Sequence, residues 1–588
     1  MILTRRLGLV PALTAGLSLS LAGMLPAAAQ TDATQAAPVV IKEALTQGIA
    51  GPYLAARQAS RHNDYAAAAR YSGELLTRGV ATPQMMETAL QADIALGKVA
   101  AALPVAQQLR AKGIKSTAAM LVVLTDELAK GEYDKALADL KAGHGIGKLV
   151  DGLITAWADL GAGRMSEATA QFDEISTTAG LQGFGLYHKA LALASVGDFE
   201  GADKILTGTD TARLQPTRRS IIAHAEVLSQ LERNDDALKL LNAAFKPGSD
   251  PGIDALRDKL KAGETLPFDI VRTPRDGLAE VYYTVASALD GQAEAGYTLI
   301  YARLAEYLRP DMAAATLLAG KLLEAQGRHK LAIAAYDSVP KDNPNAYVAE
   351  MARADALYAD GQQDAAVEVL KQLSKAYPKV LEVQVALGDL LRRQQEFEKA
   401  AAAYDAALAL IGTPQPQDWG IFYMRGISNE RIGNWKQAES DFRAALKLNP
   451  DQPQVLNYLG YALVERGEKL DEALSMIRKA VAKRPRDGYI VDSLAWALYK
   501  LGRYKEALPH MEKASQLMPV DPIVTDHLGD VYWAVGRKLE ARFQWRRALS
   551  YGPEPKDAER IKRKLAEGLD AVRKQEGATA LPAASNGG

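Results

Sequence analysis

The chain of 588 residues contains no cysteine. Without thiols it has no disulfide, no thiolate metal ligand, no thiol nucleophile and no attachment point for a lipoprotein anchor. Aromatic residues make up only 6% of the sequence, and the formal net charge is −1. The scarcity of aromatic residues argues against a β-sheet protein. The balance of charge argues against a nucleic acid as partner.

Motifs that carry catalysis or metal binding are also missing. None of the seven histidines stands in an H-x3-H or HExxH spacing, and no G-x-S-x-G motif occurs. The string from Gly143 to Val150 resembles a phosphate-binding loop, but only three residues separate Gly143 from Gly147, and Leu149 stands where a Ser or Thr would bind Mg²⁺. A turn between repeats is the simpler interpretation. We therefore expect no metal, no cofactor and no enzymatic activity.

The only long apolar run lies at the N-terminus, from Leu7 to Leu25, after Arg5 and Arg6. The small residues that follow predict a signal peptide over residues 1–29, cleaved after Ala29, although a retained membrane anchor is an alternative. Residues 30–40 are expected to form a disordered linker. Because no lipid anchor is possible, the signal predicts a protein of a Gram-negative periplasm, or a secreted protein.

Small residues recur on a regular grid in the second half of the chain. The stretch "SLAWALYKLGRYKEALPHMEKASQLMP", from Ser493 to Pro519, carries Ala495, Gly502 and Ala507 on this grid. The first grid position recurs at a nearly constant spacing, at Ala286, Gly320, Ala354, Gly388, Gly426, Gly460, Ala495 and Gly529. A unit that stacks closely on copies of itself needs such a grid, whereas a single amphipathic helix does not.

The first half repeats more weakly, without most of the closing prolines. Its first grid position is occupied by Ala56, Leu90, Leu124, Ala156, Ala190 and Ala225. The second small residue recurs at Ala68, Ala102, Ala136, Ala168, Ala202 and Ala237. These positions predict six degenerate helix pairs.

The grid resembles the tetratricopeptide repeat, with its pattern W-x2-L-G-x2-Y, A-x3-F and P over about 34 residues. The copy nearest to this pattern carries Leu528, Gly529, Tyr532, Ala541, Trp545, Ala548 and Pro553. The resemblance, to exported repeat proteins of Gram-negative, alphaproteobacteria-like bacteria, implies an all-α, right-handed α-solenoid. We expect about 13 helix pairs in two halves, with a helix that caps the C-terminal end.

The composition of the chain also predicts how it divides into segments. Residues 41–247 are assigned to the degenerate solenoid, residues 248–276 to a connector rich in proline and glycine, and residues 277–555 to the clear repeats. A short helix is expected from Ile253 to Lys261, after which residues 262–276 form either a stiff connector or an extended strand lying on the groove. A single capping helix is expected over residues 556–576, and a disordered tail over residues 577–588.

In tetratricopeptide repeat proteins the first helix of each pair lines a concave groove that contacts the partner. The resemblance places on this groove the candidate binding residues Tyr423, Ile427, Asn457, Tyr461, Tyr489, Asp492, Trp496, Tyr499, Asp526, Asp530 and Trp533. Exposed aromatic residues would supply contact area, and the aspartates favour a neutral or basic extended segment. The alternative is that the tryptophans only fill space between repeats. The family's carboxylate clamp is not recognisable, because only Asn457 fits it.

These features predict a non-enzymatic scaffold or adaptor of the cell envelope that binds another polypeptide. A chaperone or subunit of an outer-membrane biogenesis or polysaccharide export assembly is a more specific alternative. A third hypothesis is a solenoid that regulates an enzyme, such as one acting on peptidoglycan.

Overall fold

The computed structural model describes residues 48–208 and 216–577. The predicted signal peptide, the linker over residues 30–40 and the tail beyond residue 577 lie outside these residues. The described part contains 31 α-helices, one short 3-10 helix and no strand. None of its helices combines the length and the hydropathy needed to cross a bilayer.

The helices follow one another with short connections. The first thirteen are α2 (Ala50–Arg61), α3 (Tyr65–Thr77), α4 (Pro83–Ala95), α5 (Val99–Ala111), α6 (Thr117–Ala129), α7 (Tyr133–Lys141), α8 (Lys148–Gly161), α9 (Met165–Thr177), α10 (Gln182–Ser195), α11 (Phe199–Thr207), α12 (Arg218–Gln230), α13 (Asn234–Ala244) and α14 (Pro251–Lys261). The next group is α15 (Pro274–Leu289), α16 (Ala295–Leu308), α17 (Ala313–Ala325), α18 (His329–Asp337), α19 (Ala346–Ala359), α20 (Gln363–Ala376), α21 (Leu381–Arg393) and α22 (Phe397–Ala409). After η2 (Pro416–Asp418) come α23 (Trp419–Arg431), α24 (Trp435–Leu448), α25 (Pro453–Arg466), α26 (Leu470–Lys483), α27 (Gly488–Lys500), α28 (Tyr504–Leu517), α29 (Pro522–Ala534), α30 (Lys538–Ser550), α31 (Pro555–Glu567) and α32 (Leu569–Gln575).

Consecutive helices pack in pairs, which confirms the predicted all-α solenoid. The described chain has fourteen pairs, six from α2 to α13 and eight from α15 to α30, close to the expected number of about 13. The first grid position lies on the first helix of each pair, here called helix A, and the second small residue lies on helix B. Ala507 on α28, for example, has no exposed surface.

The grid positions hold small residues because helix A and helix B approach each other closely there. A Cβ atom added to Gly529 on α29 would lie 2.3 Å from Nε1 of Trp545 on α30. Gly502, between α27 and α28, has φ +74°, a left-handed conformation that favours glycine and ends helix A. The sequence pattern therefore records helix crossings and turns.

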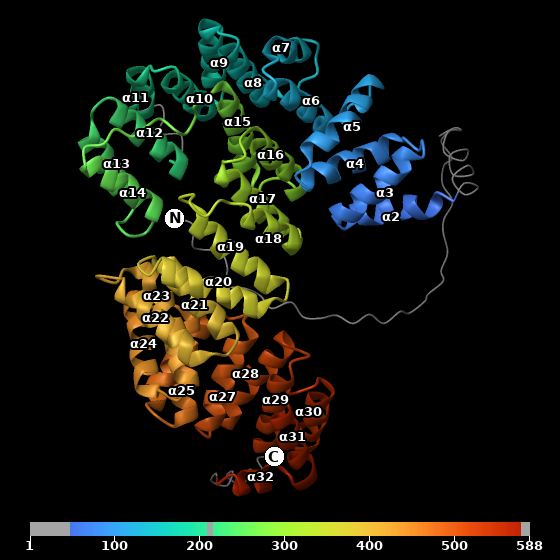
Figure 1. Ribbon diagram of the computed structural model, residues 1–588. Helices are drawn as coiled ribbons and strands as arrows, with labels where there is room; N and C mark the ends of the chain where they lie inside the picture. The colour runs from blue at the N-terminus through green and yellow to red at the C-terminus, as the bar shows by residue number, and fades with distance from the viewer. Residues whose placement is uncertain (1–47, 209–215, 578–588) are drawn as a thin grey trace.

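The pairs from α2 to α13 form an arc around the helices that follow them, with α15 and α16 inside it (Figure 1). The hydroxyl of Thr125 on α6 donates to Tyr282 Oη on α15 at 2.9 Å, and Arg303 Nε on α16 donates to the carbonyl of Ala95 on α4 at 3.2 Å. A single hydrophobic core contains residues from Ala59 to Ala356. The groove of the first six pairs is therefore filled by the chain itself.

The segment between α14 and α15 lies against α12. Its Leu266 amide donates to Ser229 Oγ at 2.9 Å, and Gln230 Nε2 donates to the Leu266 carbonyl at 2.6 Å. The amides of Asp269 and Ile270 both donate to the carboxylate of Glu226. Polar side chains of α12 thus satisfy an extended backbone that has no strand partner.

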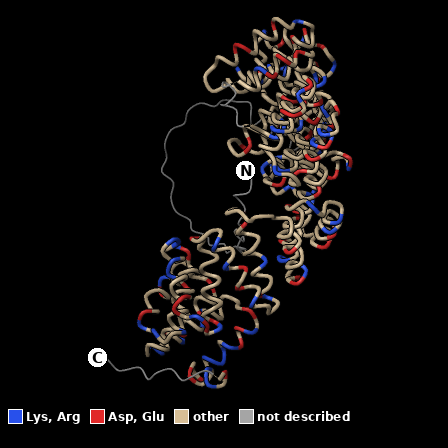
Figure 2. The backbone as a smooth tube through the Cα atoms, turned by 90° about the vertical axis from the view of Figure 1, so that its left-hand side faces the viewer, with Lys and Arg blue, Asp and Glu red and all other residues tan. Residues whose placement is uncertain are grey.

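The remaining pairs continue the solenoid around two further large cores, one from Tyr347 to Tyr404 and one from Tyr423 to Leu569. Lys and Arg are mixed with Asp and Glu along the whole described chain (Figure 2). The single capping helix expected over residues 556–576 is wrong, because Gly568 separates α31 from α32. This glycine has φ +86°, and a Cβ atom on it would lie 2.9 Å from the ring of Trp533.

Candidate functional site on the C-terminal A helices

The candidate binding residues lie on four successive A helices. Tyr423 and Ile427 are on α23, Asn457 and Tyr461 on α25, Tyr489, Asp492, Trp496 and Tyr499 on α27, and Asp526, Asp530 and Trp533 on α29. Side chains of α25, α27 and α29 contact one another across the repeats. The structure therefore brings the residues of these three helices to one surface, here called the A-helix surface.

Trp496 is not an exposed groove residue. Its side chain is buried, with 7% exposed, and its ring stacks on His527 of α29 at a centroid distance of 3.8 Å and on Tyr499 at 4.7 Å. Its Nε1 donates to Glu465 of α25 at 2.7 Å. The expectation of an open aromatic contact is wrong here, because Trp496 fills the space between three A helices.

The aspartates are also engaged within the chain. The ammonium of Lys564 on α31 lies 2.7 Å from carboxylate oxygens of both Asp526 and Asp530, and neither Lys564 nor Asp530 has exposed surface. Trp545 Nε1 donates to Asp530 at 3.0 Å. Burial raises the pKa of the Asp526 carboxyl, and the neighbouring Asp530 adds to this, although Lys564 acts in the opposite direction. The expectation that these carboxylates are available to a partner is wrong.

Asp492, the third predicted carboxylate, binds His527. The Nδ1 atom of His527 lies 3.1 Å from Asp492 Oδ1. Burial lowers the pKa of His527, but the charge of Asp492 and its hydrogen bond outweigh burial, so the pKa lies above its usual range. The pair ties α27 to α29 rather than presenting a negative charge to solvent.

Tyr499 and Trp533 are covered by α32. The Nε1 of Trp533 donates to Asp570 at 2.9 Å, and Arg573 Nη1 donates to the hydroxyl of Tyr499 at 2.9 Å. Both aromatic side chains are buried, Tyr499 with 3% and Trp533 with 8% exposed. The C-terminal helix therefore lies on the A-helix surface at the place where a partner was predicted.

Four of the predicted residues remain accessible. Tyr489 is 62% exposed, while Ile427 on α23 and Asn457 and Tyr461 on α25 are partly exposed. The Oδ1 atom of Asn457 has no hydrogen-bond donor among the described residues. Tyr423, in contrast, is buried between Phe442 and Tyr458. The accessible part of the A-helix surface thus lies on α25 and at the beginning of α27.

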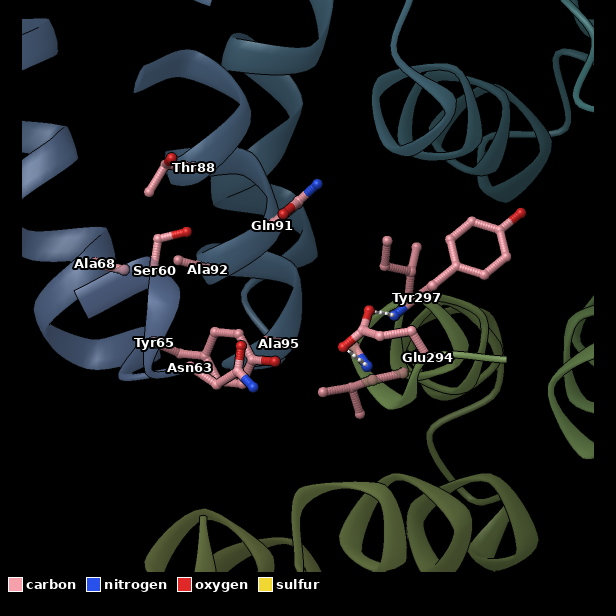
Figure 3. Close-up of a pocket in the computed structure, with 13 residues that line it drawn as sticks. Ser60, Asn63, Tyr65, Ala68, Thr88, Gln91, Ala92, Ala95, Glu294 and Tyr297 are labelled. Atoms are coloured by element: carbon pink, nitrogen blue, oxygen red, sulfur yellow. Dashed lines mark hydrogen bonds between the residues drawn. The ribbon is translucent and has the colours of Figure 1, made fainter. Parts of the chain in front are cut away.

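A separate cavity of about 240 Å³ lies where the first two pairs meet α16 (Figure 3). Its polar groups serve the fold: Glu294 caps α16 by accepting from the amides of Gly296 and Tyr297, and Tyr65 donates to Gln326. Small-molecule sites usually occupy roughly 300–1,000 Å³. The described residues also contain no group of three or more His, Asp or Glu arranged to hold a metal ion. This cavity is therefore a space left between the first two helix pairs and α16.

Sequence reasoning missed the residues that cover the A-helix surface. Lys564, Asp570 and Arg573 were assigned to one amphipathic helix that only caps the solenoid. The repeat register contained the missing signal, because Lys564 stands one repeat length after Asp530 in the sequence. This register predicts that α31 packs as a further A helix, with Lys564 beside Asp530.

The geometry defines a solenoid of helix pairs, and sequence comparison shows which repeat part of it resembles. Three models of the tetratricopeptide repeat match, over residues 299–347, 349–379 and 372–552. These residues of the chain therefore resemble tetratricopeptide repeats, and proteins built from such repeats are typically non-enzymatic scaffolds that bind other proteins.

Known proteins resemble parts of the chain. A TPR repeat-containing protein of Pseudomonas aeruginosa is 28% identical over 198 residues, which are 34% of this chain and 33% of that protein. The general transcriptional corepressor ssn6 of Schizosaccharomyces pombe is 29% identical over 136 residues, 23% of this chain and 12% of its own length. The chain thus matches a third or less of these relatives.

Solved structures give weaker resemblances. The APC/C hetero-tetramer Cut9-Hcn1 is 14% identical and covers 90% of this chain and 98% of its own, with a TM-score of 0.36. A tetratricopeptide repeat protein from Parabacteroides merdae is 19% identical and covers 43% of this chain and 97% of its own, also with a TM-score of 0.36.

Proposed function

We propose that the protein is an exported scaffold of the cell envelope that binds a partner polypeptide on the A-helix surface of its C-terminal repeats. The observation that carries this proposal is the exposure of Tyr489, an aromatic side chain of α27 that is 62% exposed on this surface. Asn457 and Tyr461 of α25 are partly exposed beside it. Exposed aromatic and amide side chains can supply contact area and hydrogen bonds to a polypeptide segment.

The binding site is placed on the C-terminal pairs because the groove of the first six pairs is already occupied. The groove of the first six pairs holds α15 and α16, whose residues Tyr282 and Leu304 have no exposed surface. On the C-terminal pairs, Tyr489 is exposed, and Asn457 carries an acceptor without a donor among the described residues. Tyr489 can supply aromatic contact area to a partner, and the partly exposed Asn457 and Tyr461 can supply polar contacts. A neutral extended segment fits these groups.

The proposal is tested by affinity capture with the full chain from a periplasmic extract of its own host. We expect Asn457→Ala with Tyr489→Ala to lose the captured protein. The matched control is Lys436→Ala with Ser440→Ala, two exposed positions on helix B α24, which should capture it as the parent does.

Equal capture by both variants would reject the A-helix surface, and a partner found only in cytosolic extracts would reject export. The identity of the captured protein separates a general scaffold from a chaperone or subunit of an outer-membrane biogenesis or polysaccharide export assembly.

A further inference from the structure

The last two helices depart from the repeat after a regular start. α31 begins about one repeat length after α29 and packs as a further A helix, with Ile561 and Lys564 buried against the preceding pair. After a regular A helix the chain turns at a glycine such as Gly467, with φ +69° and ψ +21°, and helix B follows. Gly568 instead has φ +86° and ψ +156°. The different ψ directs α32 away from the layer of B helices.

α32 lies across two repeats on their A helices. Its Asp570 accepts from Trp533 on α29, and its Arg573 donates to Tyr499 on α27. Trp533 and Tyr499 are one repeat length apart in the sequence and therefore occupy the same position in successive repeats. Two apolar side chains of α32, Leu569 and Val572, have no exposed surface. α32 thus lies on the A-helix surface as a bound amphipathic helix would.

The other internal occupant, the pair α15 and α16, is held in a different way. It contributes many fully buried side chains, including Tyr282 and Tyr301, to the largest core of the protein. An ion pair of Arg219 with the buried Glu280, to which Tyr187 also donates, fixes it further. α32 has seven residues and buries only two apolar side chains, so its local opening should require far less free energy.

We infer that the area of α27 and α29 under α32 is a binding site for an amphipathic helical segment of the partner protein, and that α32 occupies this site until the segment displaces it. This inference rests on the proposed function and adds a second, helical segment of the same partner to the extended segment that binds on α25 and the beginning of α27. The helical segment presents two apolar side chains three residues apart, an acceptor for Trp533 Nε1, and a basic side chain for the Tyr499 hydroxyl. Binding of amphipathic helices in grooves is a common recognition mode.

Because α32 belongs to the same chain as the site, it competes strongly with a free peptide. An intramolecular segment acts at an effective concentration in the millimolar range, so a free peptide with the same contacts binds the closed protein weakly. Removing polar contacts from α32, without changing α27 or α29, should open the site. Asp570→Ala with Arg573→Ala does this, because both side chains belong to α32.

The test uses the full chain and one probe, a fluorescent peptide with the sequence of residues 568–577, kept helical by a staple between positions 571 and 575. We expect fluorescence anisotropy to show at least tenfold tighter binding to the Asp570→Ala, Arg573→Ala variant than to the parent. A peptide with aspartate in place of Val572 is the matched control and should not bind. Hydrogen exchange measures in parallel whether α32 has opened.

A chemical lock provides the reverse experiment. Because the chain has no cysteine, Arg563→Cys with Gln575→Cys, added to the opened variant, allows a short bis-maleimide to join α31 to α32. Arg563 donates to Gln575 Oε1 at 3.2 Å, so the two positions lie within reach of one linker. We expect the cross-link, but not the single-ended N-ethylmaleimide, to abolish peptide binding.

Each other outcome overturns the inference. If α32 keeps its exchange protection in the opened variant, its polar contacts do not hold it. If α32 opens and the peptide still binds no better, or if the lock has no effect, α32 is only a cap. Peptide binding without any captured periplasmic protein would reject the proposed function alone. A partner captured equally by locked and unlocked protein would reject only the inference.

Discussion

Lys564 and Asp530 form an ion pair at 2.7 Å in which neither side chain has exposed surface, although a whole repeat separates them in the sequence. Asp526 shares the same ammonium. The pair joins α31 to the A helix of the last complete repeat. The residues that resembled a free binding stripe thus hold the C-terminal end of the solenoid closed.

This ion pair should be essential to the last repeat. Lys564→Met leaves two buried carboxylates with only the more distant Arg560, 3.6 Å from Asp530 and 4.0 Å from Asp526, as a counter-charge, and breaking one side of a buried pair costs about 3–5 kcal/mol. We expect a loss of this size in denaturant unfolding, with increased hydrogen exchange confined to α29–α32 because repeats contact only their neighbours. Adding Asp526→Asn and Asp530→Asn should recover part of the loss. No recovery would show that Lys564 acts through packing alone.

Trp496 should contribute to stability rather than to an exposed contact. Trp496→Ala removes a buried ring that joins α25, α27 and α29, and such truncations cost about 3–5 kcal/mol. We expect a lower melting temperature, measured by circular dichroism. Tyr489→Ala, on the same helix but 62% exposed, is the matched control and should melt as the parent does. If Tyr489→Ala lowered the melting temperature more than Trp496→Ala does, Trp496 would again be a candidate groove residue.

The destabilisation caused by a larger side chain at a helix crossing should be confined at first to one repeat. Ala507 has no exposed surface, so Ala507→Leu should destabilise its repeat by about 1–3 kcal/mol. The same change at Ala402, exposed on α22, is expected to have little effect. Hydrogen exchange followed by mass spectrometry should rise first in α27 and α28. A uniform rise over all repeats would contradict nearest-neighbour packing.

The contact between α12 and the extended segment should depend on pH. Burial raises the pKa of Glu226 to about 8, although hydrogen bonds from the amides of Asp269 and Ile270 act in the opposite direction. Between its ordinary pKa near 4.5 and about 8, the folded protein binds a proton that the unfolded chain has lost. The free energy of unfolding should therefore fall as pH rises through this window, by at most about 1.4 kcal/mol per unit, and this contribution levels off above it.

The checking measurement is denaturant unfolding at several pH values. Glu226→Gln should reduce the slope between pH 4.5 and 8, whereas Glu264→Gln, at an exposed position of the same segment, should not. An unchanged slope in Glu226→Gln would assign the pH dependence to other groups, such as the His527–Asp492 pair.

The export signal also has a direct test. If residues 1–29 form a cleaved signal peptide, protein purified from its own host should begin at Gln30, and mass spectrometry of the intact protein measures this. Protein that begins at Met1 and fractionates with the cytosol would contradict export.

Local sequence predicted the repeat units well. The grid of Ala495, Gly502 and Ala507 reflects steric limits within one helix pair, where a larger side chain would clash. Steric limits of this kind act within a single repeat, so they can be recognised in the sequence without knowing what else packs nearby. The same holds for Gly529 beside Trp545.

The candidate site was predicted less well, because exposure is decided by distant segments. Position on helix A placed Trp496, Asp526 and Trp533 on the correct surface, but α29, α31 and α32 cover them. Periodicity also predicted one capping helix, since an apolar stripe continues past Gly568. The break depends on the ring of Trp533, which lies next to that glycine only in the folded protein.

The sequence by itself therefore determined the helix pairs, their approximate number and their turns, because these depend on packing between neighbours in the chain. Only the tertiary structure decided which grooves are open. The first six pairs wrap around α15 and α16, and α32 lies on α27 and α29, since buried apolar area and buried ion pairs between remote helices outweigh the local pattern. What a partner can reach is set by these long-range contacts.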